Sequence, residues 1–230
     1  MRVWCLRLCA DPSTLENLRV VLNDEERERA DRFRFPLHRD HFVIARGVLR
    51  RLLARFLGIA AGDVEFQYAP KGKPECKSGR ALRFNLSHSG DMAIYAFAHN
   101  REVGIDIEQH REMKDLEAIA KRFFAAGEVE DLMSLAPADR PDAFFRCWTR
   151  KEAFIKAIGD GLSLPLDSFR VSLFPDQTAS IVDTPAEQRK KWQLIDVTPC
   201  TGYSAALVTE AGPLTISQFA ATTVEKLLLL

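Results

Sequence analysis

The sequence predicts an α+β protein built from two similar halves, a pseudo-dimer in one chain. Each half is expected to hold a long helix packed on a small, mostly antiparallel sheet. Two observations predict this class: a helix-length apolar pattern occurs once in each half of the 230 residues, and short strand-like runs follow it both times. The connection near 109–114 joins the halves, so we expect an N-terminal half at 1–108 and a C-terminal half at 109–230.

The elements of the N-terminal half follow from apolar spacing and capping residues. The alternation at 2–9 predicts an opening strand, and Asn23 with Glu26 is typical of a capping box that starts a charged helix. From 37 to 57 the apolar residues follow the three-four spacing of an amphipathic helix, which Gly58 ends. A loop rich in Pro, Gly and Lys covers 69–80, and strands are predicted at 64–68, 82–87, 92–98 and 102–108.

The C-terminal half repeats the pattern of helix first and strands afterwards. Helices are predicted at 115–124, 126–135 and 141–158, and Gly159 closes the last of them. Strands are predicted at 168–173, 178–182, 191–197, 203–209 and 214–219. The final LLLL at 227–230 is expected to end a helix or to pack as a tail, because it is far too short to span a bilayer.

The composition is that of an ordinary globular protein without a basic excess. Hydrophobic residues make up 47% of the chain, and Lys plus Arg equals Asp plus Glu at 32 each, so the formal net charge is zero. A general nucleic-acid binder normally carries a basic excess. We therefore expect no nucleic-acid partner, while a local basic pocket for a small phosphorylated ligand stays possible.

The cysteines and the N-terminus predict a reduced, cytoplasmic protein. The five cysteines are odd in number, scattered and without a C-x-x-C pair, so neither a zinc site nor a disulfide framework is indicated. The opening MRVWCLRLCADPS lacks the apolar run of a signal peptide. We expect a monomer that does not contact a membrane.

The stretch VGIDIEQ places two carboxylates on one face of a strand. Side chains of a strand alternate between its faces, so Val103, Ile105 and Ile107 are expected to face a core. Asp106 and Glu108 then share the other face. Like charges this close raise each other's pKa unless something positive lies between them. Two interpretations stay open at this point: a solvated strand face, or a site for a divalent cation.

A second informative stretch, WTRKEAFIKAI, places an aromatic, an acidic and a basic side chain on one face of a predicted helix. Trp148, Glu152 and Lys156 are spaced four apart, and Lys151 lies next to the stripe. One interpretation is an exposed Glu–Lys pair that contributes only about 0.3–0.5 kcal/mol. A large Trp on the same stripe favours a partly buried face, on which a Glu and a Lys require partners such as a metal and a phosphate.

Two further segments carry cationic groups. FNLSHSG puts Ser87 and His88 at a polar strand end, where the His either faces an anion or is a satisfied structural residue. YAPKGKPEC is a loop with Lys71 and Lys73, either a solvated turn or two cations beside a phosphate. Three carboxylates, a His and several Lys without a P-loop favour Mg²⁺ with a diphosphate. The residues alone indicate a metal-assisted enzyme acting on a phosphate ester or diphosphate.

FNLSHSG, VGIDIE and WTRKEAFIKAIGDGLSLPLDSF, in this order and at these separations, resemble the 4′-phosphopantetheinyl transferases. The resemblance is to the broad-specificity, Sfp-like type, which serves nonribosomal peptide and polyketide synthases, and it runs from about 68 to 174. It implies coenzyme A in the cleft between two similar halves. The implied reaction moves the 4′-phosphopantetheine arm to a serine of an apo acyl or peptidyl carrier protein and releases adenosine 3′,5′-bisphosphate.

The resemblance also implies roles for individual residues. Asp106, Glu108 and Glu152 resemble the Mg²⁺ ligands. Glu152 is the expected general base and Lys156 the group that stabilises or protonates the leaving group. The residues expected to bind the coenzyme are Arg46, Lys73, Ser87, His88, Lys151 and Lys156.

The sequence departs from the family pattern at two positions, and two other functions compete with the one that the resemblance implies. Glu26 stands near a position where a basic residue is expected, and Asp160 adds an acid after the catalytic helix. A metal-dependent phosphodiesterase or nuclease would suit an acidic pair, but the zero net charge argues against it. A carrier-binding module without catalysis would be expected to lack a member of the acidic trio, and all three members are present.

The segment MKDLEAIAKRFF, directly after the acidic strand, is expected to emerge beside the metal site. It has more apolar residues than one stripe of a short helix needs. Met113 and Phe124 are the predicted surplus that forms an exposed patch for a carrier protein. Lys121 and Arg122 are expected to face the acidic surface of that partner.

Overall fold

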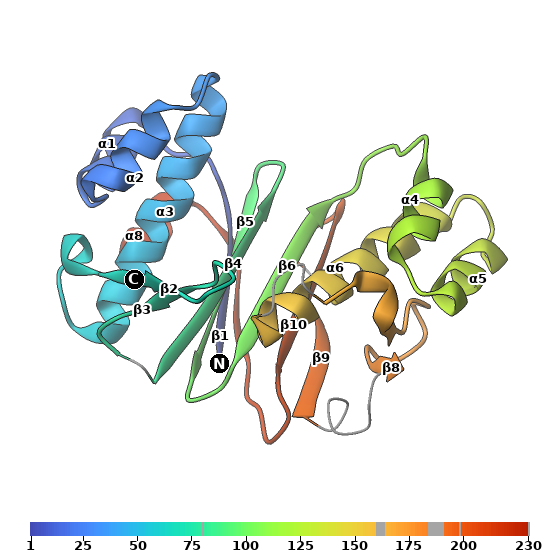
Figure 1. The fold of residues 1–230 in the computed structure, drawn as a ribbon. Helices are drawn as coiled ribbons and strands as arrows, with labels where there is room; N and C mark the ends of the chain where they lie inside the picture. The colour runs from blue at the N-terminus through green and yellow to red at the C-terminus, as the bar shows by residue number, and fades with distance from the viewer. Residues whose placement is uncertain (80, 160–163, 184–190, 198, 230) are drawn as a thin grey trace.

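The chain forms the helices and strands of an α+β fold (Figure 1). This computed structural model describes residues 1–79, 81–159, 164–183, 191–197 and 199–229. Up to residue 109 the elements are β1 (Arg2–Arg7), α1 (Pro12–Val20), α2 (Asp24–Asp31), α3 (Pro36–Leu57), β2 (Phe66–Tyr68), β3 (Pro74–Cys76), β4 (Leu82–Ser89), β5 (Met92–His99) and β6 (Val103–Gln109). After it come α4 (Leu116–Phe123), α5 (Ala126–Ser134), α6 (Arg140–Ile158), β7 (Arg170–Val171), β8 (Ile181–Asp183), β9 (Trp192–Val197), β10 (Tyr203–Glu210), β11 (Ser217–Thr222) and α8 (Val224–Leu229).

Two sheets form the centre of the molecule, each with one long helix on its outer face (Figure 1). The first has the strand order β11-β1-β5-β4, and the second has the order β6-β10-β9. All pairs in them are antiparallel except β1 with β11, which is parallel. Helix α3 packs on the first sheet and α6 on the second, so the predicted pairing of a long helix with a mostly antiparallel sheet is confirmed in both parts.

Three apolar clusters hold these layers together. One lies between α3 and the first sheet, one surrounds α6, and one lies between the sheets. The cluster between the sheets contains Val103, Ile105 and Ile107, as their alternation in β6 predicted. Asp106 and Glu108 consequently project from the opposite face of β6, where α6 crosses the strand.

The long helices end where the sequence predicted. Gly58 and Gly159 both adopt the left-handed conformation that a glycine accepts at a helix end. The capping box of Asn23 with Glu26 starts α2. Helix α1 was not predicted, and β3 lies within the segment predicted as a loop at 69–80. None of the helices in the described ranges is long and apolar enough to cross a membrane.

Each sheet contains a strand from the other side of the boundary expected at residue 108. β6 belongs to the second sheet, where Ile105 pairs with Leu207 of β10. In return β11 pairs with β1, and Leu227 of α8 joins the apolar cluster under α3. The pairing covers an edge of the first sheet that would otherwise offer unpaired backbone groups. The division at 108/109 and the similarity of the two halves stay predictions.

Candidate active site

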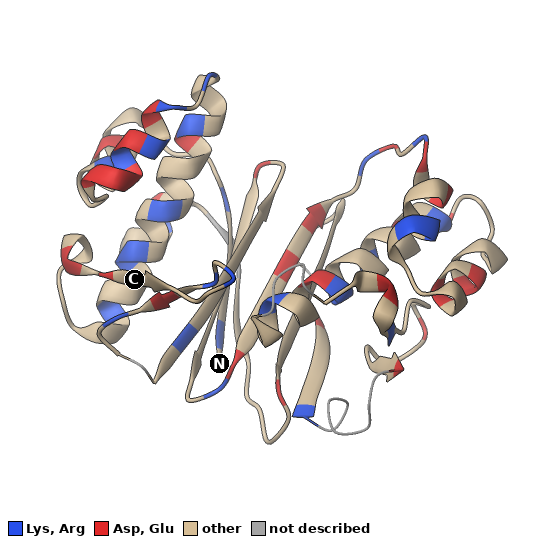
Figure 2. Ribbon diagram, viewed as in Figure 1, with Lys and Arg blue, Asp and Glu red and all other residues tan. Residues whose placement is uncertain are grey.

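A glycine brings α6 onto β6. A Cβ atom at Gly104 would lie 2.1 Å from the carbonyl oxygen of Ala153 and 2.2 Å from the backbone nitrogen of Ala157, so only glycine permits this crossing. The close approach sets Glu152 and Lys156 of α6 above the polar face of β6. Figure 2 shows this crossing as acidic segments of β6 beside acidic and basic segments of α6.

Asp106 is the buried centre of this site, with 4% of its surface exposed. Its Oδ1 accepts hydrogen bonds from Lys156 Nζ at 2.6 Å and from Ser87 Oγ at 2.7 Å. Its Oδ2 is buried and has no partner in the described structure. Burial raises the pKa of Asp106, while Lys156 and Ser87 oppose the rise. A buried carboxylate oxygen without a partner is costly and calls for a ligand.

Two more carboxylates share this field. Glu152 has a raised pKa because of burial and because Asp106 and Glu108 lie near it, with Lys156 opposing. Glu108 accepts a hydrogen bond from Ser89 Oγ at 2.8 Å. Within the described ranges no three His, Cys, Asp or Glu side chains converge closely enough to enclose a metal ion. The three predicted carboxylates thus influence one another's pKa without enclosing an ion, and Lys156 pairs with Asp106, the most buried of the three.

Strand β4 supports the acidic face through every second residue. Asn85 Oδ1 accepts from the backbone nitrogen of Ile105 at 2.8 Å, Ser87 donates to Asp106, and Ser89 donates to Glu108. These contacts join the edges of the two sheets where the acidic face lies. Our sequence reasoning included Ser87 as a coenzyme-binding residue and missed Asn85 and Ser89. A signal was available for Asn85, because it alternates with Phe84 and Leu86 in the strand predicted at 82–87, whereas Ser89 lies beyond that strand.

On the α3 side of β4 lies a cavity of about 320 Å³. Arg46, His88, Arg29 and Tyr68 are among the residues that line it. The pKa of His88 is lowered by burial first, and then by Lys156 and other nearby cations. His88 therefore lies in the wall of this cavity, close to Arg29, which disfavours protonation of the ring.

A buried carboxylate fixes the direction of Arg46. Glu26 Oε1 accepts from Arg46 Nε, and its Oε2 accepts from Arg50 Nε at 2.6 Å. The Arg46 guanidinium lies 3.9 Å from the ring centre of Phe66 and donates to Tyr68 Oη at 3.1 Å. A basic residue was expected near position 26 to bind the coenzyme directly. Glu26 instead holds two arginines by hydrogen bonds, and one of them, Arg46, lines the cavity.

A second cavity of about 310 Å³ lies on the α6 side. Lys73, Glu152 and Lys156 line it. Both cavities are bordered by Gly72, Pro74 and Leu86, so they adjoin along the loop between β2 and β3. One cleft consequently runs from the cationic pocket under α3 to the carboxylates under α6.

Comparison with known proteins assigns a family to this arrangement. A family model described as the 4′-phosphopantetheinyl transferase superfamily matches residues 102–208, and one described as 4′-phosphopantetheinyl transferase, N-terminal, matches residues 10–100. The chain is 39% identical over 210 residues to the 4′-phosphopantetheinyl transferase HetI of Nostoc sp., across 90% of this chain and 86% of that protein. The chain belongs to the 4′-phosphopantetheinyl transferases.

Other relatives place this transferase with the Sfp-like type. It is 36% identical over 183 residues to the 4′-phosphopantetheinyl transferase Sfp of Bacillus subtilis, across 79% of this chain and 80% of that protein. It is 32% identical over 203 residues to the human L-aminoadipate-semialdehyde dehydrogenase-phosphopantetheinyl transferase, across 79% of this chain and 65% of that protein. These matches confirm the family predicted from the three motifs.

Two predicted coenzyme-binding lysines of the transferase are engaged in protein contacts. Lys73 Nζ donates to Glu102 at 3.0 Å and to the carbonyls of Val103 and Ala157 at 3.1 and 3.2 Å. These bonds use its three hydrogens and tie the loop to the end of α6. Burial lowers the pKa of Lys73, and Glu102 opposes the change. The side chain lines the cleft, so its coenzyme role stays a prediction.

Lys151 lies away from the cleft. It is completely buried, its Nζ lies 2.7 Å from Glu128, and it donates to the carbonyls of Leu166 and Phe169 at 2.8 and 2.6 Å. All of its hydrogens are used, and no face of the ammonium group is open to a phosphate. The predicted coenzyme contact of Lys151 does not fit this geometry, because in the WTRKEAF helix it faces the core.

The predicted docking segment is only partly exposed. Phe124 is 3% exposed and packs against Phe144, so its predicted place in an exposed patch is wrong: the helix-spaced aromatic belongs to the core. Met113 is partly buried against the same cluster. Lys121 pairs with Glu117 on the surface. Asp160, whose role the sequence left open, lies outside the described residues.

Proposed function

We propose that the transferase moves the 4′-phosphopantetheine arm of coenzyme A to a serine hydroxyl of an apo acyl or peptidyl carrier protein, with Mg²⁺, and releases adenosine 3′,5′-bisphosphate. The observation that carries the proposal is the single cleft, which has the Arg46 and His88 pocket at one end and the Asp106–Lys156 pair near the other. A nucleotide-bearing diphosphate has its anionic groups spread in this way. The names of the relatives support the same transfer.

The carboxylates fit a magnesium ion as an open set of ligands. Mg²⁺ is usually held by one or two carboxylates together with water and substrate phosphates. Asp106 Oδ2, buried and without a partner, supplies one oxygen that lacks a function in the protein alone. Glu108 and Glu152 are the further proposed ligands. The bound ion would withdraw charge from the diphosphate.

Glu152 is the proposed general base. The serine hydroxyl is a weak nucleophile at neutral pH, and its proton has to go to a base as the oxygen attacks the phosphorus next to the pantetheine arm. Glu152 borders the cleft, so the carboxylate oxygen that does not bind the ion can accept this proton. The bond to the bridging oxygen of the diphosphate breaks, and that oxygen leaves with adenosine 3′,5′-bisphosphate.

Lys156 and the pocket residues are proposed to bind and neutralise phosphate oxygens. The Lys156 side chain is 28% exposed and borders the cleft, so its ammonium group can contact the leaving phosphate while it stays paired with Asp106. Arg46 and His88 are proposed to hold the adenosine end. Ser87, whose hydroxyl already bonds Asp106 and Lys156, acts on the coenzyme through them.

Mass spectrometry of an apo carrier protein tests the proposal. After incubation with the transferase, coenzyme A and Mg²⁺, the carrier should gain the mass of one phosphopantetheine arm on its serine. The matched controls are a carrier with that serine replaced by alanine, and a reaction with EDTA in place of Mg²⁺. An unmodified carrier in the complete reaction, with several unrelated carriers tried, would contradict the proposed substrate. Full transfer in the presence of EDTA would contradict the proposed requirement for Mg²⁺.

A further inference from the structure

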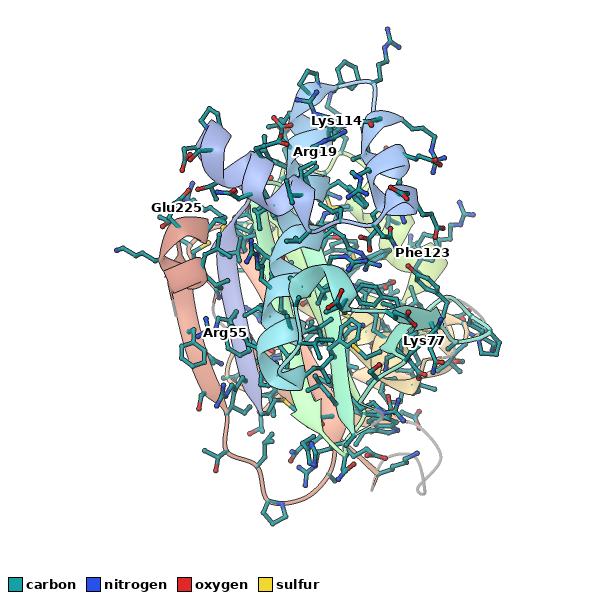
Figure 3. All side chains as sticks on the ribbon, turned by 90° about the vertical axis from the view of Figure 1, so that its left-hand side faces the viewer. Arg19, Arg55, Lys77, Lys114, Phe123 and Glu225 are labelled. Atoms are coloured by element: carbon teal, nitrogen blue, oxygen red, sulfur yellow. The ribbon has the colours of Figure 1, made fainter. Side chains whose placement is uncertain are left out.

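A second binding region lies on the far side of α3 from the cleft, against β11 and α8. Two cavities of about 470 and 420 Å³ adjoin there and share Leu52, Arg55 and Leu227 in their walls. Each is in the range of about 300–1,000 Å³ that is typical of small-molecule sites. Figure 3 looks onto this face, with Arg55 beside α3. No residue of its lining also lines the two cavities of the active-site cleft.

Three arginines border this groove without a carboxylate partner. Arg51 and Arg55 stand four residues apart on α3, and Arg2 of β1 reaches the same hollow. None of the three forms an ion pair within the described ranges, and Arg51 Nε is buried without any hydrogen-bond partner. Like charges at this helical spacing repel each other and destabilise a helix. An anion between the two guanidinium groups would remove that repulsion.

The rest of the groove is apolar and incompletely covered. Trp4 and Phe219 stack with their ring centres 4.9 Å apart at its floor. Phe56, Ile59 and Phe219 are 36%, 37% and 37% exposed, which is unusual for three large apolar side chains around one hollow. A ligand here would therefore bury a hydrocarbon surface as well as an anionic group.

We propose that this groove binds a single-chain amphiphile with one anionic head, of which a fatty acid is the simplest example. The carboxylate would lie between Arg51 and Arg55, where one acid can accept from both guanidinium groups. The chain would extend over Trp4 and Phe219. A polyphosphate does not suit the site, because the floor is hydrocarbon and its charge is limited to three arginines. The site is independent of the proposed transfer reaction.

Binding of decanoate to the full-length protein tests this site. The chain has three tryptophans, so their side-chain N–H signals in a ¹H–¹⁵N spectrum report separately on Trp4, Trp148 and Trp192. Decanoate, below its micelle-forming concentration, should shift the Trp4 signal with saturation and leave that of Trp148 unchanged. Decanol, which lacks the charge, and acetate, which lacks the chain, should each bind at least tenfold more weakly.

A double variant locates the head group. Arg51→Gln with Arg55→Gln should raise the apparent Kd of decanoate at least tenfold and leave that of decanol unchanged. The matched control is Arg32→Gln with Arg34→Gln, which removes the same charge from exposed positions at the end of α2. The single variant Arg55→Gln, with an unchanged thermal unfolding midpoint, serves if the double variant does not fold. Equal affinity for decanoate and decanol, an unaltered Kd in the variants, or shifts of all three tryptophans would overturn the proposal.

Discussion

Helix α6 carries two lysine–carboxylate pairs of almost equal length in opposite surroundings. Lys151 Nζ lies 2.7 Å from Glu128, and both side chains are completely buried. Lys156 Nζ lies 2.6 Å from Asp106, with 28% of the lysine and 6% of the aspartate side chain exposed. The distances do not distinguish the pairs. What distinguishes them is how many of the remaining polar atoms have partners.

The Glu128 pair is closed. Besides Lys151, Glu128 accepts from the backbone nitrogens of Ala125 and Val171 at 2.9 and 2.7 Å. A fully bonded pair of this kind fixes α5, α6 and the chain before β7 in one arrangement. The Asp106 pair is open, because one carboxylate oxygen has no partner and the lysine borders a cavity. Buried charge is structural where every atom is satisfied, and available for chemistry where one is not.

The largest expected effect comes from breaking the closed pair. Lys151→Met keeps the apolar stem and leaves Glu128 buried without its cation, so the free energy of unfolding should fall by about 3–5 kcal/mol. Urea unfolding followed by circular dichroism measures it. Lys121→Met is the control, because its pair with Glu117 is exposed and contributes only about 0–1 kcal/mol. Similar decreases in the free energy of unfolding of both variants would show that burial does not determine how much an ion pair contributes to stability.

Removing Asp106 of the open pair, or the neighbouring Glu152, should lower activity and leave the fold intact. Asp106→Ala or Glu152→Ala removes charge that the proposed reaction needs around the diphosphate, so transfer should fall about 10²-fold or more. Single-turnover transfer to a carrier measures this, with circular dichroism as the check on folding. Glu65→Ala, from an exposed pair with Lys77, is the control. More than a tenth of the original rate in either variant would rule out the assigned role.

Glu26 shares one feature with each pair: both of its carboxylate oxygens accept hydrogen bonds, as in Glu128, and one of its partners, Arg46, borders the cleft. Its replacement should have the next smaller effect on catalysis. Glu26→Gln should loosen Arg46 and raise KM for coenzyme A about tenfold, or ~1.4 kcal/mol, with a smaller change in kcat. The exposed Glu28→Gln is the matched control on the same helix. In an Arg46→Ala background Glu26→Gln should add nothing further, and an additive effect would show that Glu26 acts by another route.

The sequence predicted most of the fold because its signals were local. The ends of α3 and α6 depend on glycines, and the two faces of β6 depend on alternation, which are all visible within a few residues. The parallel pairing of β11 with β1 joins residues more than 200 positions apart, and no local pattern encodes it.

The site was predictable to the same extent. The spacing of two between Asp106 and Glu108, and the spacing of four between Glu152 and Lys156, singled out these residues, because the chemistry requires those residue types. Lys151 follows the same motif, and only the direction of its helix face shows that it belongs to the core. Arg46 was identified, but its dependence on Glu26 arises from a contact 20 residues away in the chain.

The smallest effect is expected at Glu152, which lies beside the open pair, and its sign should be opposite to that of a change at Glu128 in the closed pair. The pKa of Glu152 is raised in the folded chain by burial and by Asp106 and Glu108, so its ionisation destabilises the fold as pH rises through that pKa. Without Mg²⁺ and coenzyme A, and with EDTA present, Glu152→Gln should therefore raise Tm at pH 7. The gain should vanish below the ordinary pKa of a glutamate, about 4.5, where the group is neutral in both states. Glu128→Gln should lower Tm at pH 7, because it leaves Lys151 buried without its counter-charge. Thermal unfolding from pH 4 to 8 measures both, and a lower Tm for Glu152→Gln at pH 7 would show that the open carboxylate is a structural group like the closed one.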